Sequence, residues 1–157
     1  MKTLSEEQAL SKAAALCSRS EYCIEDIRSK MENWLVLPEV QERILKRLTS
    51  EKYIDEARFC HSYINDKLHF NKWGKRKIHQ MLQLKKIPRD VINKNLSTID
   101  EKDYENILKS LMDSKSKTIN AHSEYEKNMK LMRFAIGRGF EYELIRKFLS
   151  DDLEKVD

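Results

Sequence analysis

The fold of this chain is decided by three short stretches: Leu35-Val36-Leu37-Pro38, Leu84-Lys85-Lys86-Ile87-Pro88 and Ala135-Ile136-Gly137-Arg138-Gly139-Phe140. In each of them one amphipathic helical pattern ends just before the turn and another opens just after it. The turns recur at a spacing of about fifty residues, which is typical of helical units that stack and bury their apolar faces on one another. The sequence therefore predicts an elongated surface.

The rest of the chain predicts helix nearly throughout. It contains only three glycines and two prolines in 157 residues, and no stretch shows the β-branched alternation of a strand. We predict an all-α fold, an elongated, curved array of three tandem three-helix repeats with about nine helices. The predicted repeats span residues 5–50, 51–99 and 100–150, and residues 151–157 form a frayed acidic tail.

Capping residues predict where the helices begin and end. Ser5-Glu6-Glu7-Gln8 has the spacing of a capping box before a helix over residues 6–18. Ser20 is the predicted N-cap of the next helix, and Pro38 suits the first turn of the third. Further predicted features are N-caps at Asp55 and Asp100, a polar interruption from Asp113 to Ser123, and a helix end at Gly137 and Gly139.

Composition excludes several classes of protein. No run approaches eighteen apolar residues, and the N-terminus has no apolar signal region, so we predict a cytoplasmic protein without a membrane segment. The cysteines Cys17, Cys23 and Cys60 are odd in number and lack C-x-x-C spacing, which favours reduced core residues. The four histidines lack the i, i+4 pairing of a helical zinc site. With no Gly-rich phosphate loop and no nucleophile constellation, the sequence predicts no enzyme, metal or cofactor.

Positive charge is concentrated in the middle third. The whole chain has a net charge of only +4, but residues 51–100 hold eleven basic and six acidic side chains. Residues 67–89 contain no Asp or Glu. The candidate binding residues of this basic segment are Lys67, Lys72, Trp73, Lys75, Arg76, Lys77, Lys85, Lys86 and Arg89.

A basic segment of this kind has several interpretations. With Phe70 and Trp73 interleaved, it could follow a phosphate backbone and stack on bases. It could equally match an acidic protein groove. The structural alternative is a solvated helix face with Trp73 packed against a neighbouring unit. We favour an interaction surface, because unopposed basic groups repel one another and do not favour stability.

Several motifs are shared, in order and spacing, with one known family. They are Ser18-Arg19-Ser20-Glu21 followed by Ile27 and Met31, the stretch from Leu48 to Phe59 with its Arg58-Phe59 pair, Gly74 with Ile78 and Leu82, and Arg138-Gly139-Phe140 with Ile145. On these residues the chain resembles the RecX family, the small bacterial regulators of the RecA recombinase, from about Ala9 to Leu149. Two departures are Lys52, where the family commonly has glycine, and Cys60, where a small residue such as alanine is usual.

The resemblance implies a binding role. Family members are understood to lodge in the helical groove of the RecA filament on single-stranded DNA and to limit its extension, ATP turnover, strand exchange and co-protease function. It thus implies a regulator in DNA repair, the SOS response and homologous recombination, with the RecA filament as partner and single-stranded DNA as a second contact. We also expect a monomer with no small-molecule substrate.

The family-matched residues themselves are predicted to be mainly structural. They are Arg19, Glu21, Asp55, Arg58, Phe59 and Gly74. Asp55 suits a helix cap, Phe59 the core and Gly74 a special backbone geometry. Arg58 can pair with a carboxylate between repeats or bind the partner, and we favour the pairing. Arg19 with Glu21 can form an inter-repeat network or a surface contact. The alternative functions are a free-standing single-strand-binding protein and an adaptor for another partner.

Overall fold

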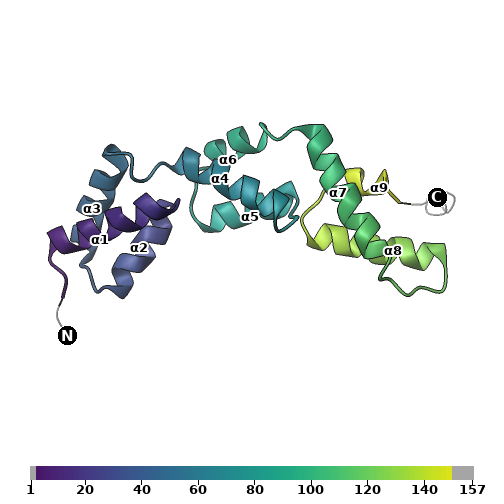
Figure 1. The fold of residues 1–157 in the computed structure, drawn as a ribbon, viewed down its shortest axis with the longest axis horizontal. Coiled ribbons are helices and arrows are strands. Elements are labelled where there is room, and N and C mark those ends of the chain that lie inside the picture. The colour runs from purple at the N-terminus through teal and green to yellow at the C-terminus, as the bar shows by residue number, and fades with distance from the viewer. Residues whose placement is uncertain (1–2, 150–157) are drawn as a thin grey trace. The chain divides into compact units, whose positions relative to one another are not determined.

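The computed structural model describes residues 3–149 and is helical, with no strand in that range (Figure 1). The all-α prediction is therefore confirmed for these residues, whereas the predicted acidic tail at 151–157 lies outside them. The helices are α1 (Glu6–Arg19), α2 (Ile24–Asn33), α3 (Pro38–Ser50), α4 (Glu56–His69), α5 (Lys75–Leu84), α6 (Arg89–Leu96), α7 (Glu101–Ser116), α8 (Glu124–Gly137) and α9 (Tyr142–Arg146).

Most helix starts follow the predicted caps. The Ser5 Oγ accepts a hydrogen bond from Gln8 N at 3.1 Å, and the Gln8 side chain accepts one from Ser5 N at 2.9 Å, which completes the capping box. Asp100 caps α7 by accepting a hydrogen bond from Asp103 N at 2.9 Å. Pro38 occupies the first position of α3, where its missing N–H costs nothing.

Two predicted boundaries are wrong. Ser20 ends α1 in an extended conformation, and α2 begins after Cys23, whose N–H donates to Asp26 Oδ2 at 3.2 Å. The carboxylate three residues into the helix thus sets its start, which a search for hydroxyl caps misses. The polar break after Asp113 begins later than predicted, because α7 continues to Ser116. Polar side chains on the exposed face of a helix do not end it.

The stretches at residues 35–38, 84–88 and 135–140 share one type of turn. The residue after the helix C-cap has a positive φ in each: +61° at Leu35, +59° at Lys86 and +95° at Gly139. The next residue donates its N–H to a carbonyl five positions back: Val36 to Met31 at 3.0 Å, Ile87 to Leu82 at 3.2 Å, and Phe140 to Ala135 at 3.2 Å. This is the Schellman arrangement, which satisfies carbonyls at a helix C-terminus.

A fourth turn of this kind lies at Lys52, where the family commonly has glycine. Lys52 follows α3 with φ +62°, and Tyr53 N donates to Leu48 O at 2.9 Å. A left-handed conformation is strained for lysine and unstrained for glycine, which also loses more chain entropy on folding. We expect Lys52→Gly to raise the free energy of unfolding by about 0.5–1 kcal/mol. Urea unfolding measures this, and Lys52→Ala, which keeps the backbone strain, should show no gain; equal gains in both variants would contradict the explanation.

The helices belong to two compact units. Unit 1 comprises the chain up to Tyr63 together with Leu82–Ile92, and unit 2 comprises Ile64–Met81 together with the chain from Asn93 onward. The repeat boundaries predicted near residues 51 and 100 remain a prediction.

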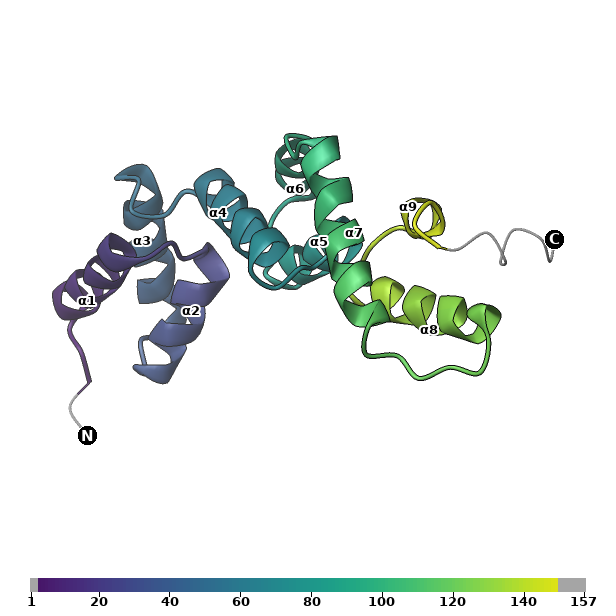
Figure 2. The same cartoon turned by 45° about the vertical axis from the view of Figure 1, so that its right-hand side comes forward.

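In unit 1, α3 packs against both α1 and α2 (Figure 2). Their apolar faces meet in a core that excludes water almost completely. Its buried members are Ala9, Ala13, Ile27, Met31, Ile44, Leu45, Leu48 and Ile54. Cys23 is also buried, and burial raises the pKa of its thiol to about 12, so this cysteine is an unreactive core residue.

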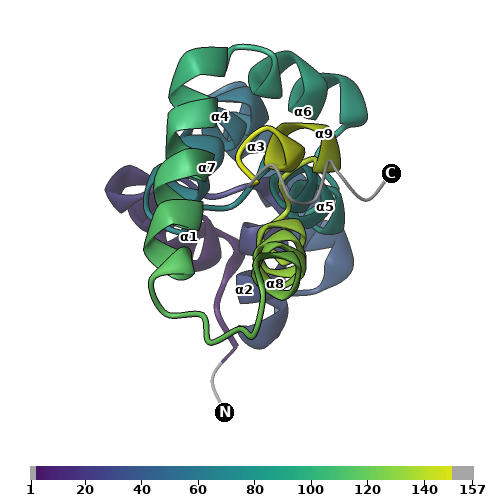
Figure 3. The ribbon, with the colours of Figure 1, turned by 90° about the vertical axis from the view of Figure 1, so that its right-hand side faces the viewer.

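In unit 2, α8 packs against both α7 and α9 (Figure 3). Its core includes the side chains of Tyr104, Leu108 and Phe140, and the rings of Tyr104 and Phe140 lie 5.3 Å apart between centroids. The N-terminal part of α5 belongs to the same unit. The first residues of α5 are basic, and their surroundings in unit 2 determine the charge of this surface.

Candidate cationic interaction surface

The first turn of α5 is unusual in its charge. It begins Lys75-Arg76-Lys77 and carries no acid, whereas every other helix of residues 3–149 has at least one acid in its first turn. The N-terminus of a helix carries a partial positive charge, so cations there are unfavourable for the isolated helix. We call these three residues the α5 cationic turn. The helix dipole therefore does not favour cations at these positions.

The backbone N–H groups of this helix end are already bonded within unit 2. Gly74 N donates to Arg138 O at 2.7 Å, and Arg76 N donates to Gly139 O at 3.0 Å. Lys75 N donates to the Tyr104 hydroxyl at 2.9 Å. The α5 N-terminus therefore does not offer these amides to an anion, and the charge it presents comes from its side chains.

Gly74 and Gly139 allow the close approach that makes these bonds. A Cβ atom added to Gly74 would lie 2.3 Å from the Gly139 carbonyl carbon, and one added to Gly139 would lie 2.3 Å from the Lys77 Cβ. The sequence interpretation of Gly74 as a residue of special geometry is thus explained by a backbone contact. It was the fold, and no local pattern, that brought Gly139 opposite it.

The basic side chains of unit 2 differ in how they are engaged. Lys75 Nζ pairs with Glu101 at 2.7 Å and lies 4.5 Å from the Tyr104 ring centroid. Lys67 and Lys77 place their ammonium groups 4.9 and 4.6 Å from the ring centroid of the half-buried Trp73. Such contacts are favourable by about 0.5–1 kcal/mol at exposed sites. Of the two aromatic residues in the basic segment, Trp73 is thus covered in part by cations, whereas Phe70 has 80% of its surface exposed.

Arg76 is exposed, and Lys72 adopts a positive φ of 56° in the turn before α5. Sequence reasoning missed a further cation of this surface, Arg138. Its guanidinium donates to Asn71 O at 2.9 Å and lies 5.1 Å from the Phe134 ring centroid. Its place in the Arg138-Gly139-Phe140 motif was the available signal, but the bond to Asn71 spans 67 residues of sequence. Arg138 therefore brings a cation from the turn after α8 to the turn that precedes α5.

The remaining basic residues of the segment, Lys85, Lys86 and Arg89, lie in unit 1. Lys85 and Lys86 form ion pairs there with carboxylates of α2. Lys85 Nζ is 2.8 Å from Asp26 and lies 5.8 Å from the Phe59 ring centroid. Lys86 Nζ is 3.9 Å from Glu25. The expectation that the whole basic segment is unopposed is wrong for Lys75, Lys85 and Lys86, because α2 and α7 supply the carboxylates that the segment lacks. Arg89 is exposed.

The Asp26–Lys85 pair makes stability depend on pH. Burial raises the pKa of Asp26, but hydrogen bonds from Lys85 and from the Cys23 N–H outweigh it, so the pKa lies below its usual value. A carboxyl group with a lowered folded pKa stabilises the protein above the unfolded pKa of about 3.9, and loses that contribution as pH falls toward the folded pKa. We expect Asp26→Asn to cost about 1–2 kcal/mol at pH 7.

That cost should shrink steadily below about pH 4, where the wild-type carboxyl group also becomes protonated. Urea unfolding of both proteins between pH 7 and pH 2 gives the measurement. A cost that stays constant over this range would show that the charge of Asp26 contributes nothing.

Three of the family-matched residues of unit 1, Glu21, Asp55 and Arg58, form one polar cluster. Arg58 Nε donates to Glu21 at 2.5 Å, and its Nη2 donates to the carbonyls of Lys52 and Tyr53 at 3.1 and 3.3 Å. Asp55 Oδ1 accepts from Arg58 N at 3.0 Å, as a cap of α4 does. Phe59 is 6% exposed and Arg19 is exposed at the end of α1. Arg58 thus joins the turns before α2 and α4, and Arg19 lies outside this cluster.

Within residues 3–149, no group of three His, Cys, Asp or Glu side chains is arranged to hold a metal ion. None of the helices in that range has the length and apolar character needed to cross a membrane.

Comparison with known proteins gives the family. The model of the second three-helix domain of RecX matches residues 55–96, and that of the third three-helix domain matches residues 103–149. The chain belongs to the RecX family. The regulatory protein RecX of Clostridium tetani is 30% identical over 69% of the chain, and that of Vibrio vulnificus is 29% identical over 89% of the chain.

RecX relatives differ in length. The chain spans 50% of the Clostridium tetani RecX and 51% of the Leuconostoc mesenteroides RecX, about half the length of these curated relatives, but 90% of the Vibrio vulnificus RecX. Among solved structures, the crystal structure of RecX from Lactobacillus salivarius has a TM-score of 0.81 at 16% identity, with 96% of this chain and 97% of that chain covered. The RecX fold is therefore shared across most of the chain.

Proposed function

We propose that this chain is a non-enzymatic regulator that binds the RecA recombinase filament on single-stranded DNA, in its helical groove, and inhibits its ATPase, filament extension and strand exchange. The relatives are regulatory proteins by name. The observation that carries the proposal is the α5 cationic turn, because it places three cations and no acid at the positive end of a helix, and such a surface favours an anionic partner. We further propose that the chain acts as a monomer in the cytoplasm.

The mechanism requires no chemistry by this chain. A filament groove repeats, so a binder with two modest contacts gains effective concentration by bridging adjacent protomers. A bound regulator then hinders the rearrangement of protomers during ATP turnover. Cations on its surface also speed association with an anionic nucleoprotein polymer.

A recombinase ATPase assay on single-stranded DNA tests this function. Titration of the wild-type chain should reduce ATP turnover at substoichiometric or equimolar ratio. Arg76→Glu/Lys77→Glu should weaken inhibition by at least about tenfold, because two attractive contacts become repulsive. Lys75 is left unchanged because its bond to Glu101 supports the fold. Lys102→Glu/Lys109→Glu, with exposed lysines of α7 in the same unit, is the matched control and should retain inhibition.

Wild-type protein that leaves ATP turnover unchanged would refute the proposed function. If both double variants lose potency equally, overall charge drives binding, and the assignment to the α5 cationic turn is wrong.

The second candidate is direct binding of single-stranded nucleic acid. The observation that favours it is Phe70, which is highly exposed two residues before Lys72 and can stack on a base. This function predicts binding to an oligonucleotide without recombinase, with log affinity falling steeply against log salt and with a loss in Phe70→Ala. Inhibition of the recombinase without such binding would favour the regulator.

A further inference from the structure

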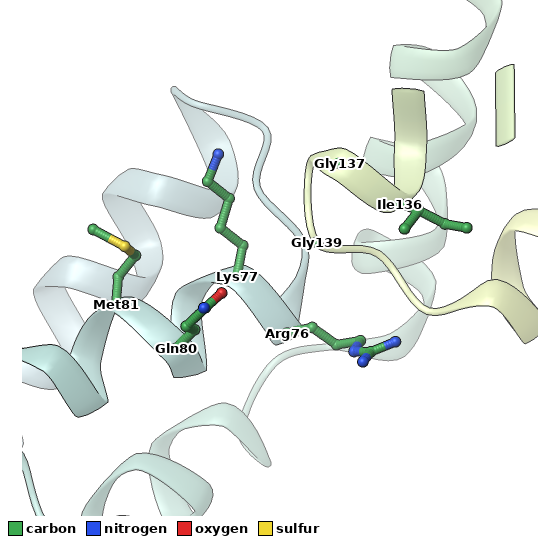
Figure 4. Close-up of a pocket in the computed structure, with 7 residues that line it drawn as sticks. All are labelled: Arg76, Lys77, Gln80, Met81, Ile136, Gly137 and Gly139. Carbon is green, nitrogen blue, oxygen red and sulfur yellow. The ribbon is translucent and has the colours of Figure 1, made fainter. Parts of the chain in front are cut away.

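A pocket of about 540 Å³ lies beside the α5 cationic turn in unit 2. One wall is the α5 face formed by Arg76, Lys77, Gln80 and Met81, and the other is the end of α8 and its following turn (Figure 4). Ile136, which is 45% exposed, and the glycines at 137 and 139 line this second wall. The pocket therefore joins a cationic edge to an apolar side chain and a bare stretch of backbone.

The glycine at the end of α8 leaves part of this wall open. A Cβ atom added to Gly137 would meet no heavy atom within 4 Å, and its backbone is not in the left-handed region. Gly137 thus does not adopt the left-handed conformation that Gly139 adopts, and it relieves no close contact of the kind found at Gly74 and Gly139. A glycine inside a helix end costs stability relative to alanine. Its lack of a side chain leaves this part of the pocket wall open.

The charged and apolar residues of the pocket together indicate which kind of ligand fits it. Arg76 and Lys77 offer donors for carboxylates at the edge, and Gln80 offers an amide that can bond a backbone. Ile136 and Met81 offer apolar surface that a buried anchor side chain can cover. Purely anionic ligands would leave this apolar surface unused, and a purely apolar one would leave the cations unmatched.

We propose that this pocket receives an apolar side chain of an acidic protein segment, whose flanking carboxylates meet Arg76 and Lys77. The inference rests on the proposed function in that the segment belongs to the recombinase. The pocket adds an apolar anchor contact to a binding surface that otherwise acts through charge alone.

A titration followed by NMR tests the pocket without the recombinase. The chain has only three glycines, so the amide signals of Gly137 and Gly139 are readily assigned. The probe is a short peptide with one leucine flanked on both sides by glutamates. It should shift both signals saturably, and changing its leucine to alanine should weaken binding by at least about tenfold. Equal shifts with a peptide that has lysines in place of the glutamates, or no shift with the acidic probe, would overturn the proposal.

Two substitutions of Gly137 distinguish an effect on the pocket from an effect on the stability of the fold. Gly137→Leu fills the open wall and should weaken peptide binding by at least about tenfold, whereas Gly137→Ala fills little of it and should retain binding. Both variants should melt at or above the wild-type temperature. Unchanged peptide binding by Gly137→Leu would overturn the pocket.

The recombinase assay then distinguishes the two levels of proposal. If the wild-type chain inhibits ATP turnover and Gly137→Leu inhibits it equally well, the pocket inference fails while the proposed function stands. If the wild-type chain does not inhibit, the proposed function fails, and with it the assignment of the segment to the recombinase. A single-stranded oligonucleotide that shifts the two glycine signals and displaces the acidic peptide would also overturn the inference, in favour of a nucleic-acid site.

Discussion

Gly139→Ala is expected to destabilise the protein by about 3 kcal/mol or more, because it combines backbone strain with overpacking. Gly139 has a φ of +95°, which alanine rarely adopts. The new Cβ would lie 2.3 Å from the Lys77 Cβ and 2.6 Å from the Lys77 N. These atoms belong to the backbone and Cβ of Lys77 in the first turn of α5, so they cannot move aside without moving that turn. The midpoint of urea unfolding measures the loss.

Gly137→Ala is the matched control, two residues away in the same turn region. Its Cβ meets nothing, and alanine in a helix is favoured over glycine by about 0.5–1 kcal/mol, so this variant should be slightly more stable than wild type. Gly74→Ala should resemble Gly139→Ala, since its Cβ would lie 2.3 Å from the Gly139 backbone. If all three alanine variants unfold at the same urea concentration, the close approach of the two backbones is wrong.

Tyr104→Phe is expected to cost about 2 kcal/mol, although it removes a single oxygen atom. The Tyr104 side chain is 1% exposed, and its hydroxyl accepts from Lys75 N at 2.9 Å and donates to Glu141 Oε2 at 2.9 Å. Burial raises the pKa of Tyr104, so the hydroxyl stays protonated at neutral pH and can donate to Glu141. Phenylalanine would leave an N–H group and a carboxylate without this partner.

Tyr142→Phe provides the control for the loss of a hydroxyl. Tyr142 is 41% exposed at the start of α9, and its substitution should change stability by less than about 0.5 kcal/mol. Chemical denaturation of the two variants under the same conditions gives the comparison. Equal stabilities would mean that water replaces the Tyr104 hydroxyl, and that the bond to Lys75 does not hold the start of α5.

These two predictions concern the same structural element. Gly74, Gly139 and Tyr104 together fix the first turn of α5, where Arg76 and Lys77 are presented. Uncharged contacts, made by two glycines and a tyrosine hydroxyl, thus fix the position of the α5 cationic turn. A variant can lose binding at this surface through either set of residues, and only stability measurements tell the two causes apart.

Local sequence patterns predicted much of the fold. The capping box at Ser5, the cap at Asp100 and Pro38 at the start of α3 were predictable because each depends on groups within three residues of sequence. The three turns were predictable as turns, although two of them use Leu35 and Lys86, and not glycine, in the left-handed conformation. The start of α2 was missed because a carboxylate acting from within the helix replaced the expected hydroxyl cap.

The charge of the candidate surface was predictable only in part. The absence of acids from residues 67–89 is a fact of the sequence, but the partners of Lys75 and Lys85 come from positions 26 and 59 residues away. Trp73 was expected either to stack on bases or to pack against a neighbouring unit, and the sequence did not indicate that the ammonium groups of Lys67 and Lys77 lie over its ring. Arg138 joined the surface through a bond across 67 residues.

The sequence by itself determined that this chain is helical, where most of its helices begin and turn, and to which family it belongs. Those properties arise from periodicity, caps and motifs, which act between near neighbours along the chain. Only the tertiary structure decided which cations are neutralised, which glycines bring two backbones together and where a pocket remains open. Ion pairs and close contacts depend on distances in space, and packing sets those distances between residues that the sequence keeps far apart.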